Sequence, residues 1–273
     1  MTCFDMFTCQ SNIIGDGCLY RKNVIGAVAG LVFFLASTAF AAHPLITDDT
    51  GVQGAGKYQL ELNLEHAHND DLGVTENETQ FSGTLSYGIM DNLDIAMDVP
   101  WNRSEANEGG ETRRSENGIA DVSISAKWRF YENAGFSLAL KPGVTLPTGD
   151  DTRGLGAGKV TYSVYLIATQ EIKPFVLHLN LGYIRNENKN DERLDIWHVS
   201  LAAEYAATEA LKIVANVGQE ENPDKAEDKD PAFILCGLIY SITENFDVDF
   251  GIKRALNDAE PDYTLLAGIA FRF

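Results

Sequence analysis

The chain has 273 residues, of which 40 are acidic and 21 are basic, and its formal net charge is -19. Such an acidic chain repels the phosphates of nucleic acids, which excludes nucleic-acid binding as a sensible function. Apart from one segment near the start, no apolar run is long enough for a membrane-spanning helix.

The first 41 residues predict a leader that carries a secretory signal peptide. Arg21 and Lys22 precede the apolar run 24–40, and small residues at its exit supply a cleavage site. We expect cleavage after Ala41, and an uncleaved membrane anchor is the alternative. Residues 1–18 lie ahead of the basic flank, and their apolar residues recur at no regular spacing. This favours a misassigned translation start.

Only one of the four cysteines, Cys236, remains after cleavage, so an intrachain disulfide is excluded in the mature chain. The mature chain opens with residues 42–56, which are polar, rich in turn-forming residues and without a period. We predict that they form a periplasmic N-terminal lead-in, which has the option of tucking into the interior of the following domain.

From residue 57 to the end, apolar and polar side chains alternate in one segment after another. Successive side chains of a strand point to opposite faces, so each segment predicts a strand with one apolar face. The predicted fold class is all-β, a transmembrane antiparallel up-and-down β-barrel of residues 57–273. Twelve strands are expected, near 57–66, 78–89, 93–103, 118–131, 136–147, 159–170, 174–185, 195–206, 210–218, 232–242, 246–254 and 262–273.

The connections between these segments alternate strictly between short and long. Bacterial outer-membrane barrels have short periplasmic turns and longer outer loops, so the alternation predicts the outer membrane of a Gram-negative bacterium, with both termini in the periplasm. The short connections lie near 90–92, 132–135, 171–173, 207–209 and 243–245, and the long ones near 67–77, 104–117, 148–158, 186–194, 219–231 and 255–261.

The last strand ends the chain on a phenylalanine. Tyr263, Phe271 and Phe273 share one parity, which fits the aromatic girdles of a barrel. They also resemble the signal that the barrel-assembly machinery reads. An edge strand of a soluble sandwich is the alternative for this stretch alone.

Two groups of residues resemble a known family. The first is His43-Pro44-Leu45-Ile46-Thr47-Asp48-Asp49 with 56–61, and the second is the stretch 141–150 with Gly154 and Gly156. They resemble the outer-membrane family named for the meta-cleavage pathway of phenol degradation, over essentially the whole mature chain. The resemblance implies a transporter-like barrel that moves aromatic or other hydrophobic compounds, and it brings no catalytic residues.

Charged side chains on the inward parity are expected to face the lumen. They predict either a conduit whose charges select solutes or a lumen closed by ion pairs, since twelve strands make a barrel of intermediate width. The candidates are Glu61, Asp94, Asp98, Asp121, Lys127, Arg129, Lys141, Glu204, Lys212, Asp249, Lys253 and Arg272.

Two prolines interrupt predicted strands. Pro100 and Pro142 cannot donate ladder hydrogen bonds, so they are candidates for a lateral gate through which a hydrophobic solute leaves the barrel. A bulge that only bends the strands is the alternative.

An enzyme is not predicted. His198 and Ser200 share an inward face, but no catalytic signature flanks them, which leaves an outer-membrane lipid hydrolase as a minor alternative. The acidic loop 220–230 lacks the regular spacing of a calcium loop, so no metal site and no cofactor are expected. The function that we expect is passive passage of small hydrophobic or aromatic solutes, with a closed structural or adhesive barrel as the alternative. The expected partners are outer-membrane lipid and lipopolysaccharide, the barrel-assembly machinery and the solute.

Overall fold

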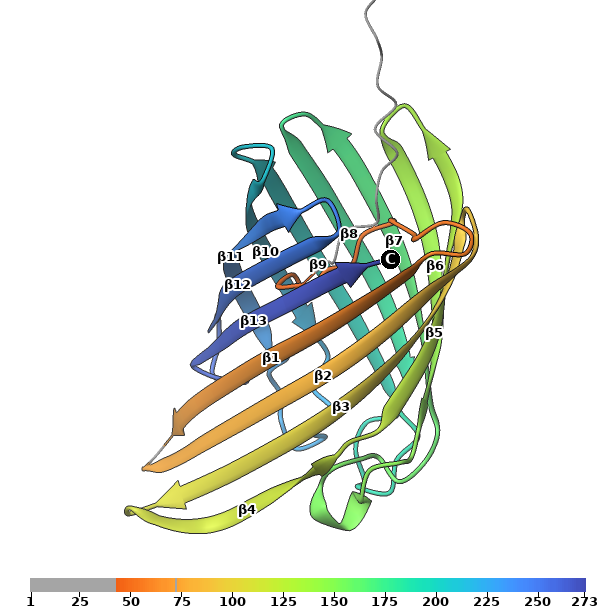
Figure 1. Ribbon diagram of the computed structural model, residues 1–273. Helices are drawn as coiled ribbons and strands as arrows, with labels where there is room; N and C mark the ends of the chain where they lie inside the picture. The colour runs from red at the N-terminus through yellow and green to blue at the C-terminus, as the bar shows by residue number, and fades with distance from the viewer. Residues whose placement is uncertain (1–42, 72) are drawn as a thin grey trace, which may run out of the picture. The chain divides into compact units, whose positions relative to one another are not determined.

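The computed structural model describes residues 43–71 and 73–273, so the predicted leader lies outside the described residues. This part of the chain forms strands and one short 3-10 helix, η1 (Asp151–Arg153) (Figure 1). None of its helices is long and apolar enough to cross a membrane. The strands are β1 (Tyr58–Asp71), β2 (Val74–Met90), β3 (Leu93–Glu108), β4 (Glu111–Ile119), β5 (Val122–Asn133), β6 (Phe136–Leu146), β7 (Thr161–Ile172), β8 (Phe175–Arg185), β9 (Asp195–Ala206), β10 (Leu211–Glu220), β11 (Ala232–Thr243), β12 (Phe246–Ala255) and β13 (Tyr263–Arg272).

Twelve of the strands close into an antiparallel barrel. Each of them pairs with the next one along the chain, β3 passes over β4 to pair with β5, and β13 returns to β1. At this seam the backbone N–H of Tyr58 donates to the carbonyl of Phe273 at 2.8 Å, and the N–H of Phe273 donates back at 3.0 Å. The prediction of an all-β barrel with twelve strands is confirmed.

The ends of the first strands that lie away from the C-terminus differ from the prediction. The stretch 104–117, expected as a loop, continues β3 and forms β4, which pairs with β3 from Trp101–Ile119 to Glu108–Glu111. Most of 67–77 is likewise paired strand of β1 and β2. These stretches are polar on both parities, so their sheet has no apolar face. Side-chain alternation therefore ends before the hydrogen-bonded ladder does.

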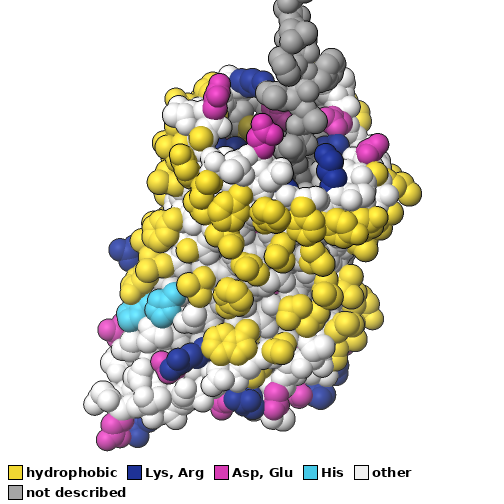
Figure 2. Space-filling view, viewed as in Figure 1, with side chains coloured by type: hydrophobic (Ala, Val, Ile, Leu, Met, Phe, Trp, Pro, Cys, Tyr) yellow, Lys and Arg dark blue, Asp and Glu magenta, His cyan; other side chains and the backbone are white. Residues whose placement is uncertain are grey.

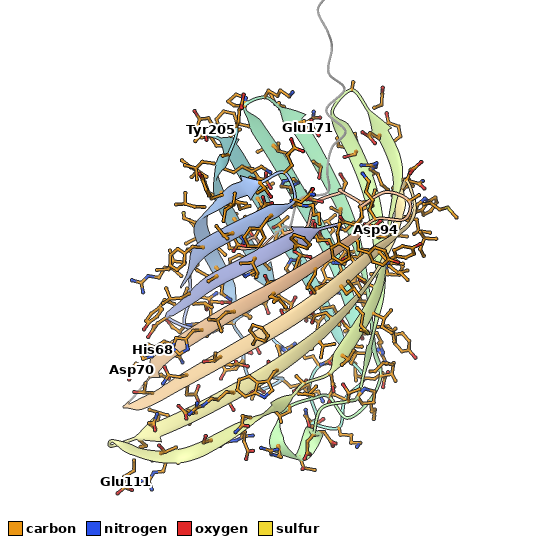
Figure 3. All side chains as sticks on the ribbon, viewed as in Figure 1. His68, Asp70, Asp94, Glu111, Glu171 and Tyr205 are labelled. Carbon is orange, nitrogen blue, oxygen red and sulfur yellow. The ribbon has the colours of Figure 1, made fainter. Side chains whose placement is uncertain are left out.

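The two faces of the wall have opposite polarity. Figure 2 shows hydrophobic side chains in a belt across the outer face, with charged side chains gathered beyond it at both ends. Glu171 lies at a tight turn at one end, and Asp70 and Glu111 lie at hairpin ends at the other (Figure 3). The inward positions are mostly polar and buried, for example Gln59, Ser82, Asn180, Ser200 and Asn216.

One side of the lumen is filled by apolar side chains. Phe233 and Leu235 of β11 pack there with Val214 of β10 and Leu266 of β13, and Leu45, which precedes β1, joins the same cluster. Burial of such side chains contributes about 1.5–3 kcal/mol each. The interior is therefore a packed core on this side, and a conduit has room only on the other.

Candidate functional site

The lead-in, of which residues 43–56 are described, lies inside the barrel. The carboxamide oxygen of Asn216 on β10 accepts hydrogen bonds from the backbone N–H groups of Ile46 at 2.8 Å and Thr47 at 3.1 Å. Further along, the N–H of Thr50 donates to the hydroxyl of Thr169 at 3.2 Å, and the N–H of Gln53 donates to Asp94 at 2.7 Å. The lead-in thus bridges strands from several parts of the wall and occupies the lumen.

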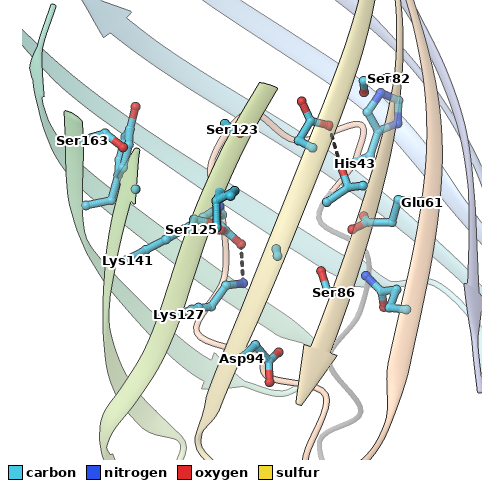
Figure 4. Close-up of a pocket in the computed structure, with 18 of the residues that line it drawn as sticks. His43, Glu61, Ser82, Ser86, Asp94, Ser123, Ser125, Lys127, Lys141 and Ser163 are labelled. Carbon is cyan, nitrogen blue, oxygen red and sulfur yellow. Dashed lines mark hydrogen bonds and ion pairs between the residues drawn. The ribbon is translucent and has the colours of Figure 1, made fainter. Parts of the chain in front are cut away.

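Asp48 is the central anchor of the lead-in. Its two carboxylate oxygens each accept from a lysine Nζ at 2.7 Å, Oδ1 from Lys127 of β5 and Oδ2 from Lys141 of β6. Figure 4 shows both lysines pointing into the pocket from neighbouring strands. Burial works to raise the pKa of Asp48, but the two ammonium groups outweigh it and hold the pKa well below its usual range. This carboxylate is therefore ionised at neutral pH, and the anchor is intact there.

The two ends of the described lead-in are fixed as well. His43 Nδ1 lies 2.5 Å from Asp249 Oδ1 on β12. At the other end, the N–H of Gly56 donates to the carbonyl of Gly88 at 2.8 Å, where the lead-in passes over β2. A Cβ at Gly88 would lie 1.8 Å from the carbonyl oxygen of Gly54, so only glycine allows this close approach.

A cavity of about 540 Å³ remains between the lead-in and the wall (Figure 4). Strands β1, β2, β3, β5, β6 and β7 line it, which places it opposite the apolar cluster. Its lining is largely polar, with serines, carboxylates and the two lysines, and it also includes Tyr165 and Val144. The volume falls within the range of about 300–1,000 Å³ of pockets that take small molecules.

The twelve predicted lumen charges divide into two groups by position. Glu61, Asp94, Asp98, Lys127 and Lys141 line the cavity. The others lie outside it, and most of them lie beside a side chain of opposite charge or, for Asp249, beside a histidine. The pairs, with their N···O distances, are Lys212 with Glu204 at 2.8 Å, Arg272 with Asp247 at 2.6 Å, Asp249 with His43 at 2.5 Å, Lys253 with Glu260 at 2.5 Å and Arg129 with Glu132 at 3.2 Å.

Asp121, the remaining lumen candidate, organises a loop at the end of the barrel away from the C-terminus. It follows β4, and its carboxylate accepts from the backbone N–H groups of Gly149 and Ala157, both at 2.8 Å. A Cβ at Gly156 would lie 2.3 Å from Asp121 Oδ1, and one at Gly149 would lie 2.0 Å from the carbonyl oxygen of Leu155. Gly149 and Gly156, both part of the motif formed by 141–150 with Gly154 and Gly156, thus leave room for a loop wrapped around one carboxylate.

Substitution of Gly156 by alanine is expected to destabilise this loop by roughly 1–3 kcal/mol, because the added methyl group collides with the Asp121 carboxylate. Arg153, held by Glu116 at 2.7 Å, lies in the same loop and offers a trypsin cleavage site. Trypsin should cleave the folded variant at Arg153 faster than the unsubstituted barrel. Gly83→Ala on β2, where the added Cβ meets only Leu62 at 3.5 Å, is the control. Equal cleavage rates would contradict the role given to Gly156.

The two prolines of the predicted lateral gate do not share a face. Pro100 is buried and Pro142 is exposed. Pro100 pairs with Ser82 on β2. On its other side two residues of β3, 99 and 100, stand opposite three residues, 120–122, where β4 gives way to β5, which makes a bulge. Pro142 pairs with Val164 on β7. The ladder is continuous on one side of each proline.

The inward histidine and serine of the minor enzyme alternative do come together. Ser200 Oγ lies 2.9 Å from His198 Nε2, and His198 Nδ1 lies 3.0 Å from Glu220 Oε2. Ser200 is only 2% exposed, and the ring of Phe233 packs at the same place against Gly218. The serine and histidine are thus buried beneath Phe233, on the side of the lumen that the apolar cluster fills. Over residues 43–71 and 73–273, no group of three or more His, Cys, Asp or Glu side chains is arranged to hold a metal.

The terminal aromatics lie where the last strand meets the first. The Phe273 ring stacks on Tyr58 with centroids 5.5 Å apart and contacts Phe271 at 5.6 Å. At the other end of β13, Tyr263 stacks on His68 at 5.0 Å. All three predicted aromatics of the assembly signal therefore lie along the closing seam or next to it.

Asp94, Lys127, Lys141 and Asp249 were predicted as lumen charges, but their role as anchors of the lead-in was not predicted. Asp48 belongs to a motif that the sequence does display, but Asn216, Thr169 and Ser137 are ordinary inward polar residues of their strands. The paired acids after Leu45-Ile46 are the one signal that could have pointed to a docked segment.

Solved structures share this architecture. The fold resembles the COG4313 outer membrane channel from Pseudomonas putida F1, with a TM-score of 0.66 at 14% identity over 82% of this chain and 98% of that one. It also resembles the KdgM porin, with a TM-score of 0.53 at 10% identity over 78% of this chain and 99% of that one. No curated protein matches the sequence. Residues 41–273 match the family model described as putative MetA-pathway of phenol degradation, and the chain belongs to that family.

Proposed function

We propose that this chain is a passive outer-membrane channel for small hydrophobic or aromatic solutes. The observation that carries the proposal is the cavity of about 540 Å³ inside a barrel whose outer face is apolar. The family's link to phenol degradation supports aromatic solutes. The polar lining favours aromatics that bear a hydroxyl or another polar group, because such groups hydrogen-bond to the serines and carboxylates of the cavity.

The proposal includes an orientation. Short turns lie at the end of the barrel where β1 begins and β13 finishes, which supports periplasmic termini and an outer surface formed by the longer loops. In this orientation the belt of exposed apolar side chains contacts lipid, and the polar hairpins beyond it contact lipopolysaccharide.

The proposal is tested by single-channel conductance of the mature chain, residues 42–273, in planar bilayers with and without phenol. A steady current that phenol reduces is the expected result. Ser125→Trp should abolish the effect of phenol, since Ser125 lines the cavity and an indole would fill it. Ser115→Trp, at an exposed position of β4, is the matched control and should leave the effect intact.

A closed structural barrel is the second candidate, because the lead-in is fixed at both ends and at its centre. A folded, heat-modifiable barrel without any current would favour it and contradict the channel. A current that phenol does not change would preserve the channel and remove aromatic solutes from the proposal.

A further inference from the structure

Charge is unevenly distributed around the cavity. The basic groups of its lining are the ammonium groups of Lys127 and Lys141, on β5 and β6, and the imidazole of His43. Five carboxylates face them: Asp48, Glu61, Glu65, Asp94 and Asp98. The lining thus holds five carboxyl groups against two ammonium groups.

Both lysines form ion pairs with the lead-in. Asp48 bridges the two Nζ atoms at 2.7 Å each, and Lys127 Nζ also lies 3.7 Å from Asp49 Oδ1 and donates to the Asp49 carbonyl at 3.2 Å. A lysine held in this way has little attraction left for a solute anion. The positive side of the cavity is therefore neutralised by residues of the chain itself.

The other four carboxylates of the lining accept no lysine Nζ, although Asp94 of β3 stands directly across the ladder from Lys127 of β5. Among the described residues, Glu61 and Glu65 of β1 and Asp94 and Asp98 of β3 form no ion pair with a basic side chain. Asp98 Oδ1 accepts from the neutral hydroxyl of Thr84 at 2.7 Å. Asp94 is only 5% exposed, and its Oδ1 is buried without a hydrogen-bond partner within the described part of the chain.

We infer that the cavity is a cation site, which takes potassium ions and protonated aromatic amines and rejects anions of the same size. This inference deepens the proposed channel function and rests on it. A carboxylate removed from water needs a counter-charge, and a solute cation beside Glu61, Asp94 and Asp98 supplies it. Carboxylates that line a narrow lumen are a general device for cation selectivity.

The test is the reversal potential of the refolded mature barrel under a potassium chloride gradient. A potassium-to-chloride permeability ratio above about 3 is expected. The double variant Glu61→Gln/Asp98→Asn should bring this ratio toward 1. The matched control is Glu209→Gln/Glu244→Gln, which removes two carboxylates from exposed turns outside the cavity and should leave the ratio unchanged.

Three probes of one shape then test the solute class. Benzylammonium should reduce the current, benzyl alcohol should reduce it less, and benzoate should have no effect. The double variant should lose the advantage of benzylammonium over benzyl alcohol. If this variant fails to fold, Asp98→Asn alone provides the same comparison.

The outcomes distinguish failure of the cation site from failure of the proposed channel function. An anion preference, or equal ratios in the double variant and the unsubstituted barrel, would overturn the cation site and leave the channel standing. Absence of current in every protein would contradict the channel instead. Binding of benzylammonium to the detergent-folded barrel, measured by calorimetry, would then decide the site by itself, and no binding would overturn it.

Discussion

Replacement of Asp48 by alanine is expected to raise the single-channel conductance of the barrel several-fold. The substitution removes the one carboxylate that Lys127 and Lys141 share. In the structure, the side chains of these lysines are only 18% and 33% exposed. Leaving partly buried lysines without their partner is expected to weaken the docking of the lead-in by roughly 1–3 kcal/mol, less than for a fully buried pair because water still reaches both. The lead-in should then leave the lumen for part of the time.

The same variant has a second readout. Freed from Asp48, the two lysines face the cavity with their charges uncompensated, so the permeability ratio should shift toward anions as the conductance rises. Asp91→Ala is the control, because Asp91 also accepts from the lead-in, at 3.2 Å from the N–H of Ala55, but at an exposed position on the rim. An unchanged conductance in Asp48→Ala, or an equal rise in Asp91→Ala, would show that Asp48 is not the central anchor.

Deletion of Phe273 is expected to lower the amount of assembled barrel in the outer membrane by about an order of magnitude. It removes two backbone hydrogen bonds to Tyr58 and the ring contact at 5.5 Å, which together contribute about 2–3 kcal/mol to the seam, and 1.4 kcal/mol corresponds to a factor of ten. It also removes the terminal aromatic that we expect the assembly machinery to recognise. Heat-modifiable mobility of the membrane fraction measures the assembled amount.

Two controls distinguish the loss of contacts at the seam from the loss of recognition by the assembly machinery. Phe273→Tyr retains the aromatic ring and both backbone bonds, so its abundance should match that of the unsubstituted protein. Refolding of the deletion variant into detergent without any machinery measures the seam alone. Normal refolding combined with loss in cells would support recognition, and normal abundance in cells would contradict both roles of Phe273.

The sequence predicts the wall of this barrel well where its outer face is apolar. The segment of β11 is apolar on both parities, and from its sequence we assign Ile234, Cys236, Leu238 and Tyr240 to the outward face. These four residues are exposed, while Leu235 and Ile239 are buried. The prediction fails near 104–117, where water contacts both faces and hydrophobic alternation carries no signal. Every residue carries backbone groups, so hydrogen bonding between strands continues there even though the side chains do not alternate.

The interior is less predictable for a different reason. Parity shows that Lys127 and Asn216 point inward, but it does not show what they contact. Their partners are Asp48 and the backbone of residues 46 and 47, up to 170 positions away in the sequence, on a segment with no period of its own. Asp121 shows the same limit, because it keeps an inward parity and yet lies at a break between strands, where it binds a loop.

The seating of the lead-in also has a consequence for the order of folding. His43 contacts Asp249, 206 positions later, and both precede the last strand to join the ring. Contacts of such long sequence separation carry a high loop-closure entropy, so they form late, after intervening strands have aligned. We therefore expect the lead-in to be seated only when the strands that hold it, from β3 to β12, stand in place. A newly made molecule should then pass through a stage in which much of the wall exists and its lumen is still unobstructed.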